Sequence, residues 1–252
     1  MTIAQRNDLD EVTIENGGKF YFLASWKHPR DGDFGILWNI AMNARAATAN
    51  MLDLLENIRM NERLSDEAKR DDSKEVAMKA LTTLGAQQRK LNEFEAGVDN
   101  ERLKLAQIPD ADAAQAVVDV ALADYFRALS GENRMGMIAE LAAGSQARMV
   151  DAVLRLPAVL FGLTDEIRSV IEANAIARRA PDEVRILADK AQAVRMTQQV
   201  ISKCVKIVTQ SSMLDMQEQI TSLGRDAWQP HVRGGAPDAM AALANRYLAK
   251  AT

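Results

Sequence analysis

The chain of 252 residues has few of the side chains that most often bind metals or form covalent links. It contains one cysteine, Cys204, and two histidines, His28 and His231. A single cysteine excludes an intramolecular disulfide and is typical of a reducing compartment. Two histidines far apart in the sequence do not make a histidine-rich metal site, and neither belongs to the Glu-x-x-His pair of di-iron bundles. We therefore expect no cofactor.

Sequence motifs of catalysis are also missing. The segment 131–136 has the glycine spacing of a phosphate-binding loop, but Met137 and Ile138 follow it where Lys and Ser or Thr are needed. We find neither a Gly-x-Ser-x-Gly elbow nor a Gly-x-Gly-x-x-Gly fingerprint. We predict that the protein is not an enzyme, with a catalytic site assembled only by the fold as the alternative.

The sequence lacks a long hydrophobic run. The most apolar stretch, 150–163, is interrupted by Asp151, Arg155 and Pro157 and is shorter than the ~20 residues of a membrane helix. The first twelve residues carry acids where a signal peptide needs a basic and then an apolar region. We expect no membrane span and a location in the cytoplasm or in an assembled particle.

The composition is that of a folded soluble protein, with 48% hydrophobic and 26% charged residues. From Ile36 onward, apolar residues recur at helical spacing. The last long helix could run from Pro181 to Leu223, about 43 residues or ~64 Å. The segments that we predict as helices are 36–63, 65–107, 109–129, 133–156, one that starts at Thr164, one that starts at Pro181, and 237–250. The second of these could instead break at Gly97.

Two of these segments carry narrow apolar seams with spacings of three and four residues. The seam of the long helix after Pro181 consists of Val184, Leu187, Ala191, Val194, Gln198, Ile201, Val205 and Val208. The weaker seam of the second helix consists of Ala77, Leu81, Leu84, Gln88, Leu91 and Val98. Such seams need helices lying alongside, from the same chain or from a neighbouring subunit. We predict a mostly α fold built as an elongated helical bundle.

The N-terminal region differs from the rest. Asn16-Gly17-Gly18 lies between short β-prone runs, and these residues tolerate the positive φ of a tight turn. The pattern predicts a hairpin over about 11–24, followed by a loop from His28 to Asp33. The predicted domains are an N-terminal arm at 1–35, a helical bundle at 36–229, and a loop with a short helix at 230–252.

Residues 17–38 hold six of the twelve aromatic residues of the chain. These six are the predicted partner interface: Phe20, Tyr21, Phe22, Trp26, Phe34 and Trp38. They could instead pin the arm to the protein's own helices. Nucleic acid is a weaker alternative, because Asp31 and Asp33 dilute the nearby positive charge.

A second candidate contact is a basic stretch. Between Arg178 and Lys206 there are seven basic and three acidic residues, although the whole chain has a net charge of −4. Arg178, Arg179, Arg185 and Arg195 are the residues that could contact a polyanion. The alternative is a solvated helix face. The span has no aromatic side chains on which bases could stack, so we do not expect a nucleic-acid partner.

The residues carry no family motif. Long helices, twelve methionines and a projecting arm favour a structural subunit of a larger, oligomeric complex. A bacteriophage virion is one setting in which such a subunit would serve. The alternatives are an adaptor or regulator that binds one protein partner, and a helical-bundle enzyme whose site is not visible in the sequence.

Overall fold

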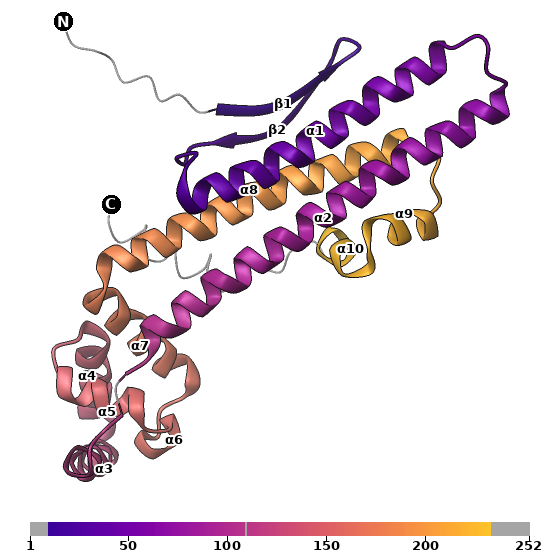
Figure 1. Ribbon diagram of the computed structural model, residues 1–252. Helices are drawn as coiled ribbons and strands as arrows, with labels where there is room; N and C mark the ends of the chain where they lie inside the picture. The colour runs from indigo at the N-terminus through magenta and orange to yellow at the C-terminus, as the bar shows by residue number, and fades with distance from the viewer. Residues whose placement is uncertain (1–9, 109, 233–252) are drawn as a thin grey trace, which may run out of the picture. The chain divides into compact units, whose positions relative to one another are not determined.

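The computed structural model describes residues 10–108 and 110–232 (Figure 1). In this part of the chain, ten helices hold 78% of the residues, and the two strands form one antiparallel hairpin at the N-terminal end. The prediction of a mostly α protein with long helices and a small N-terminal hairpin is confirmed. The chain divides into two compact units, Met1–Val98 with Ala188–Thr252 and Asp99–Leu187. We call them the long-helix unit and the short-helix unit.

The hairpin consists of β1 (Asp10–Asn16) and β2 (Lys19–Trp26). Gly17 and Gly18 have φ values of 54° and 75°, so both use the left-handed region that a two-residue hairpin turn demands. Val12 pairs with Ala24 and Thr13 pairs with Phe22, which leaves Leu23 as an extra residue in β2. Because of this bulge, the neighbouring side chains of Leu23 and Ala24 are both buried.

Three long helices form most of the rest of the core in the long-helix unit: α1 (Gly32–Met60), α2 (Asp66–Ala106) and α8 (Pro181–Ser211). Leu214, Leu223 and Ala227, which follow α8, belong to the same core. All six residues of the predicted α2 seam are buried, as are six of the eight in α8; Val184 and Gln198 are half-buried. The amides of Gln88 and Gln198 each donate a hydrogen bond to the other, over 2.7 and 3.0 Å. This reciprocal pair fixes the register of α8 along α2, because a shift would leave the buried Gln88 side-chain oxygen without its donor.

The chain after α8 differs from the sequence prediction. The helix from Pro181 ends at Ser211 and does not reach Leu223, because Asp215 caps a separate helix, α9 (Met216–Leu223), by accepting from the backbone N–H of Glu218. After Gly224 comes α10 (Arg225–Val232), which includes the Gln229-Pro230 pair that we predicted as loop.

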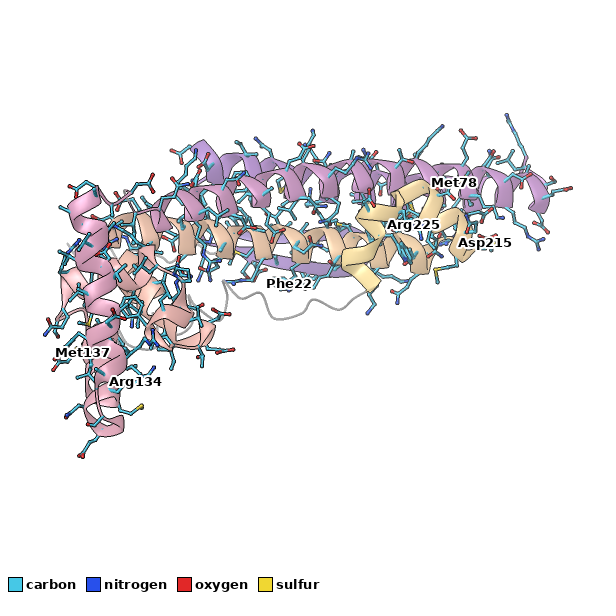
Figure 2. All side chains as sticks on the ribbon, turned by 90° about the horizontal axis from the view of Figure 1, so that it is seen from below. Phe22, Met78, Arg134, Met137, Asp215 and Arg225 are labelled. Carbon is cyan, nitrogen blue, oxygen red and sulfur yellow. The ribbon has the colours of Figure 1, made fainter. Side chains whose placement is uncertain are left out.

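A glycine allows α9 to approach α2 closely. A Cβ atom at Gly85 would lie 1.9 Å from the backbone oxygen of Leu223, so no larger residue fits there without moving α9. Lys74 of α2 also pairs with Glu218 of α9 at 3.0 Å. Figure 2 shows Asp215 and Arg225 on the side of α2 that carries Met78. The turn formed by α9 and α10 is thus tied to α2.

The short-helix unit contains α3 (Ala113–Ala128), α4 (Gly131–Ala143), α5 (Ala147–Arg155), α6 (Ala158–Phe161) and α7 (Asp165–Arg179). Helix α3 packs on α5 and α6, and α7 packs on α4 and α5. Their shared core includes Phe126, Leu141, Val153, Phe161 and Ile171.

Three predicted boundaries can be compared with these helices. The start at Thr164 is confirmed, since its side chain accepts from the N–H of Ile167. The single helix over 133–156 is wrong, because Gly144 adopts a φ of 72° and ends α4. The helix predicted from Pro109 begins at Ala113, where Asp112 forms a capping box with Gln115. Pro109 and the predicted helix at 237–250 lie outside the described residues.

Candidate interaction surfaces

The two faces of the hairpin have different environments. On the inner face, Val12, Ile14, Leu23 and Trp26 are at most 2% exposed and belong to the same core as the long helices. Tyr21, Phe34 and Trp38 are partly buried against this core. Four of the six predicted interface aromatics, Tyr21, Trp26, Phe34 and Trp38, therefore pack within the protein's own fold.

An aromatic cluster joins the end of β2 to the first turns of α1. The Trp26 ring lies 5.4 Å from that of Trp38, and the His28 ring stacks on Phe34 at 5.0 Å. Burial lowers the pKa of His28; Asp189 opposes this effect and Lys27 adds to it. The guanidinium of Arg30 covers the Trp38 ring at 4.4 Å. This cluster anchors the arm to the helices.

The outer face of the hairpin exposes the other two aromatics. Phe20 is 62% and Phe22 44% exposed, on positions that pair with Glu15 and Thr13. Helix cations hold the sheet beneath them: Lys203 of α8 donates to the Phe22 carbonyl and lies 4.9 Å from its ring. Arg45 of α1 donates to the Thr13 carbonyl. Figure 2 shows Phe22 at the margin of the long-helix unit. The outer face is thus an aromatic surface on a firmly held sheet.

A second apolar surface lies on α3, and sequence reasoning missed it. Its exposed side chains include Val117, Val118, Val120 and Tyr125, with exposed fractions between 45% and 71%. The exposed charges on this helix are Asp124 and Arg127, which pair with each other at 3.9 Å. The signal in the sequence was a helix of alanine and valine with very few charges. Exposed apolar patches of this kind often mark protein contacts.

The basic residues of the predicted polyanion contact are used in other ways. Arg178 donates to the carbonyls of Ala142 and Ala143, and Arg179 pairs with Asp151. Arg185 pairs with Asp182 one turn away. These three belong to the short-helix unit, whereas Arg195 is half-buried on the part of α8 in the long-helix unit. The four arginines are thus divided between the two units.

The short-helix unit also buries a carboxylate that the sequence did not single out. Asp119 is 1% exposed and pairs with Arg148 at 2.9 Å and Arg155 at 3.1 Å. A pocket of about 630 Å³ beside it is lined by Asp119, Arg155, Arg168 and Glu172, among others. The lining also includes Asp110, so it carries three carboxylates and two guanidinium groups.

The remaining chemistry of the described residues is sparse. Burial raises the pKa of the Cys204 thiol to about 11, which leaves it protonated and unreactive at neutral pH. Within residues 10–108 and 110–232 there is no group of three His, Cys, Asp or Glu side chains placed to hold a metal ion. In the same ranges, no helix combines the length and the apolar character that a membrane span requires.

Searches among protein-family models, characterised proteins and solved structures find no match to this chain. The function must therefore be inferred from the side chains and surfaces described above.

Proposed function

We propose that this protein is a non-catalytic α-helical subunit that assembles with other protein chains, including copies of itself, through the outer face of its hairpin. The observation that carries the proposal is the exposure of Phe20 and Phe22 on a sheet whose opposite face lies in the core. Removing the apolar surface of two phenylalanine rings from water is favourable, so covering them with a partner would stabilise a complex.

The support beneath these two side chains strengthens the proposal. Phenylalanine has few rotamers to lose on binding, and the bonds from Lys203 and Arg45 already hold the sheet. A surface ordered before contact loses less conformational entropy on association than a mobile one. The flanking Glu11 and Glu15 would form part of a polar rim of the kind that surrounds aromatic anchors in protein interfaces.

The exposed apolar surface of α3 offers a second contact on the other unit. A chain with two such surfaces could join more than one neighbour, as a structural subunit must. A bacteriophage virion or another assembled particle in the cytoplasm is a setting that suits this role. An adaptor that binds one partner is the second candidate, and it would use the same hairpin face with a fixed stoichiometry.

The test is a pair of serine substitutions, Phe20→Ser with Phe22→Ser, against the control Leu54→Ser. Leu54 is exposed to 48% on α1, similar to Phe22, and lies outside the hairpin. We expect the mass of the wild-type protein in solution to rise with concentration. The double variant should weaken association about 30-fold or more, as loss of an aromatic anchor worth about 2 kcal/mol does, while Leu54→Ser should not.

Sedimentation across a wide concentration range measures these masses. A wild-type chain that stays monomeric throughout would overturn self-assembly. Equal weakening by all three substitutions would show that the hairpin face is not the contact.

A further inference from the structure

The outer face of the hairpin presents different side chains on its two strands. On β1 it presents Glu11, Thr13 and Glu15, the positions that alternate with buried ones. On β2 it presents the exposed rings of Phe20 and Phe22. Thr13 pairs with Phe22 across the hairpin. Glu15 pairs with Phe20 in the same way. One strand of this face is thus polar and the other aromatic.

The charges beside the two strands also differ in sign. The exposed carboxylates of Glu11 and Glu15 form no ion pair with any residue that the structure describes. At the β2 edge, Lys203 of α8 lies 4.9 Å from the Phe22 ring and pairs with no described carboxylate. Arg45 also reaches the β1 edge, where two carboxylates outweigh its one guanidinium. The face is therefore negative along β1 and positive along β2.

The same two cations occupy the edges of the sheet. Lys203 donates to the carbonyl of Phe22 on β2. Arg45 donates to the carbonyl of Thr13 on β1. An open strand edge can pair with a strand of another chain, whereas a charged side chain on the edge opposes such pairing. A partner that docks on the outer face leaves both bonds in place, and a strand added at either edge would break one.

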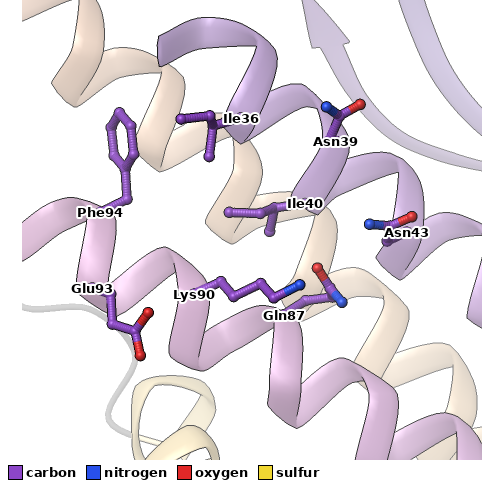
Figure 3. A pocket seen from close by; sticks show the side chains of 8 residues that line it. All are labelled: Ile36, Asn39, Ile40, Asn43, Gln87, Lys90, Glu93 and Phe94. Atoms are coloured by element: carbon purple, nitrogen blue, oxygen red, sulfur yellow. The ribbon is translucent and has the colours of Figure 1, made fainter. Parts of the chain in front are cut away.

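The long-helix unit has another open surface, the groove between α1 and α2. Its lining includes Ile36, Ile40 and Phe94, together with Lys90 and Glu93 (Figure 3). The lining carries one cation and one carboxylate, so its charge pattern does not point to one partner. The outer face of the hairpin, in contrast, has opposite charges separated onto its two strands.

Two such faces can meet with aligned strands about either of two two-fold axes. An axis across the strands places β1 on β1 of the second copy, with carboxylates against carboxylates. An axis along the strands places β1 of each copy over β2 of the other. Lys203 of one copy, at the level of Phe22, then lies beside Thr13 of the other. Glu11 and Glu15 flank Thr13 at about 7 Å along the strand, so opposite charges meet.

We propose that the partner of the outer face is a second copy of this chain, in a two-fold dimer in which β1 of each copy lies over β2 of the other. This inference rests on the proposed function and specifies the partner and the orientation of the hairpin contact. The arrangement also places the large ring of Phe22 opposite the short side chain of Thr13. Because a two-fold interface uses the same surface of both copies, each contact occurs twice.

Charge reversal on one strand at a time tests this orientation. In Glu15→Lys two cations would face each other across the dimer, and in Lys203→Glu two carboxylates would. We expect each variant to associate about ten-fold more weakly than the wild type, because each altered contact occurs twice. The control Lys206→Glu reverses an exposed charge one turn further along α8 and should associate like the wild type. Sedimentation of the full chain over a range of concentrations measures these affinities.

An equal mixture of Glu15→Lys chains and Lys203→Glu chains provides the decisive measurement. In a mixed dimer one chain contributes two cations and the other contributes two carboxylates, so opposite charges meet at both contacts. We expect the mixture to associate within about two-fold of the wild type, although neither variant does so alone. Failure of the mixture to recover would overturn the proposed dimer.

Lys203→Met provides a second route if Lys203→Glu lowers the helix content measured by circular dichroism. It keeps an apolar side chain against Phe22 and removes the charge that Glu15→Lys would repel. In this background, Glu15→Lys should change association less than about two-fold. A ten-fold loss that persisted in this background would overturn the contact between Glu15 and Lys203 of the second copy.

Two further outcomes separate this dimer from the proposed function. A wild-type chain that stays monomeric would overturn the dimer together with self-assembly. If Phe20→Ser with Phe22→Ser weakened association and the charge reversals did not, the hairpin face would remain the contact and the two-fold arrangement would be wrong.

Discussion

The long-helix unit and the short-helix unit differ in how many backbone groups at helix ends lack a partner in their own helix. Helices of 29, 41 and 31 residues have few ends for their length. The short-helix unit uses five helices of 4 to 16 residues, so a large share of its carbonyls belongs to last turns without partners in their own helix.

Side chains from neighbouring helices satisfy these carbonyls in the short-helix unit. Arg134 of α4 donates to Phe161 and Gly162 at the end of α6, and Arg168 of α7 donates to Leu154 near the end of α5. Arg178 and Asn174 of α7 donate to the last carbonyls of α4. Cations at helix C-terminal ends also interact favourably with the helix dipole. Arg178, one of the four arginines that the sequence suggested as a polyanion contact, thus caps the C-terminal end of α4.

The long-helix unit is instead held by apolar seams, by the Gln88–Gln198 pair and by the hairpin that closes its side. Charged side chains therefore have different structural roles in the two units. In the long-helix unit, Lys203, Arg45 and Lys74 add single links to elements that an apolar core already joins. In the short-helix unit, arginines satisfy the helix ends and a buried carboxylate. Four predictions test this difference, from the largest effect to the smallest.

The largest effect should come from Trp26→Ala in the long-helix unit. Trp26 is 1% exposed and contacts Trp38, so its removal should cost about 3–5 kcal/mol of unfolding free energy. Phe20→Ala, on the outer face of the same strand, should cost less than about 0.5 kcal/mol. Urea denaturation of both variants measures the contrast. If both variants lost less than about 0.5 kcal/mol of unfolding free energy, the hairpin would not belong to the core.

In the short-helix unit, Asp119→Ala should cost about 3 kcal/mol, because it leaves Arg155 with a mostly buried charge and Arg148 without its partner. Asp124→Ala on the same helix removes only an exposed pair with Arg127 and should cost below about 0.5 kcal/mol. Denaturation followed by amide exchange in α3 and α5 locates the loss. If the two aspartates proved equivalent, the ion cluster would not hold this unit together.

A smaller effect is expected for Arg178→Ala. The last carbonyls of α4 would lose a charged donor, at a cost of about 1–2 kcal/mol. Arg185→Ala removes an exposed pair with Asp182 at spacing i, i+3 and should cost less than about 0.5 kcal/mol. Thermal unfolding of both variants compares capping with a surface ion pair. A larger loss of stability for Arg185→Ala than for Arg178→Ala would refute the capping role.

The smallest effect concerns pH. Burial lowers the pKa of His28 from its ordinary value of 6.5, so the folded state favours the neutral ring. The folded chain then binds fewer protons than the unfolded chain, and stability should fall as the pH drops below about 6.5 toward the lowered pKa. His28→Gln should reduce this loss. Denaturation midpoints at about pH 7.5 and 5.5 show whether the wild type and the variant differ.

Features that depend on a few neighbouring residues could be predicted from the sequence. The hairpin turn follows from Gly17 and Gly18, whose backbones reach positive φ without strain, and α7 begins where Thr164 caps it. The seams on α2 and α8 follow from a repeat that places side chains on one helix face. Each of these signals is local, so the sequence contains all of the information that they need.

Other features depend on residues far apart in the chain. The sequence placed Phe20 in the predicted hairpin and Trp26 just after it, whereas both lie in β2. The bulge at Leu23 and the contact with α1 decide that Trp26 is inside and Phe20 outside. The helix ends at Ser211, and the chain after it packs α9 against Gly85. The buried Asp119 depends on two arginines that lie about 30 residues further along the chain. Local pattern determined the elements of this protein, whereas their faces, ends and buried charges were decided by packing, because burial is a property of neighbours in space.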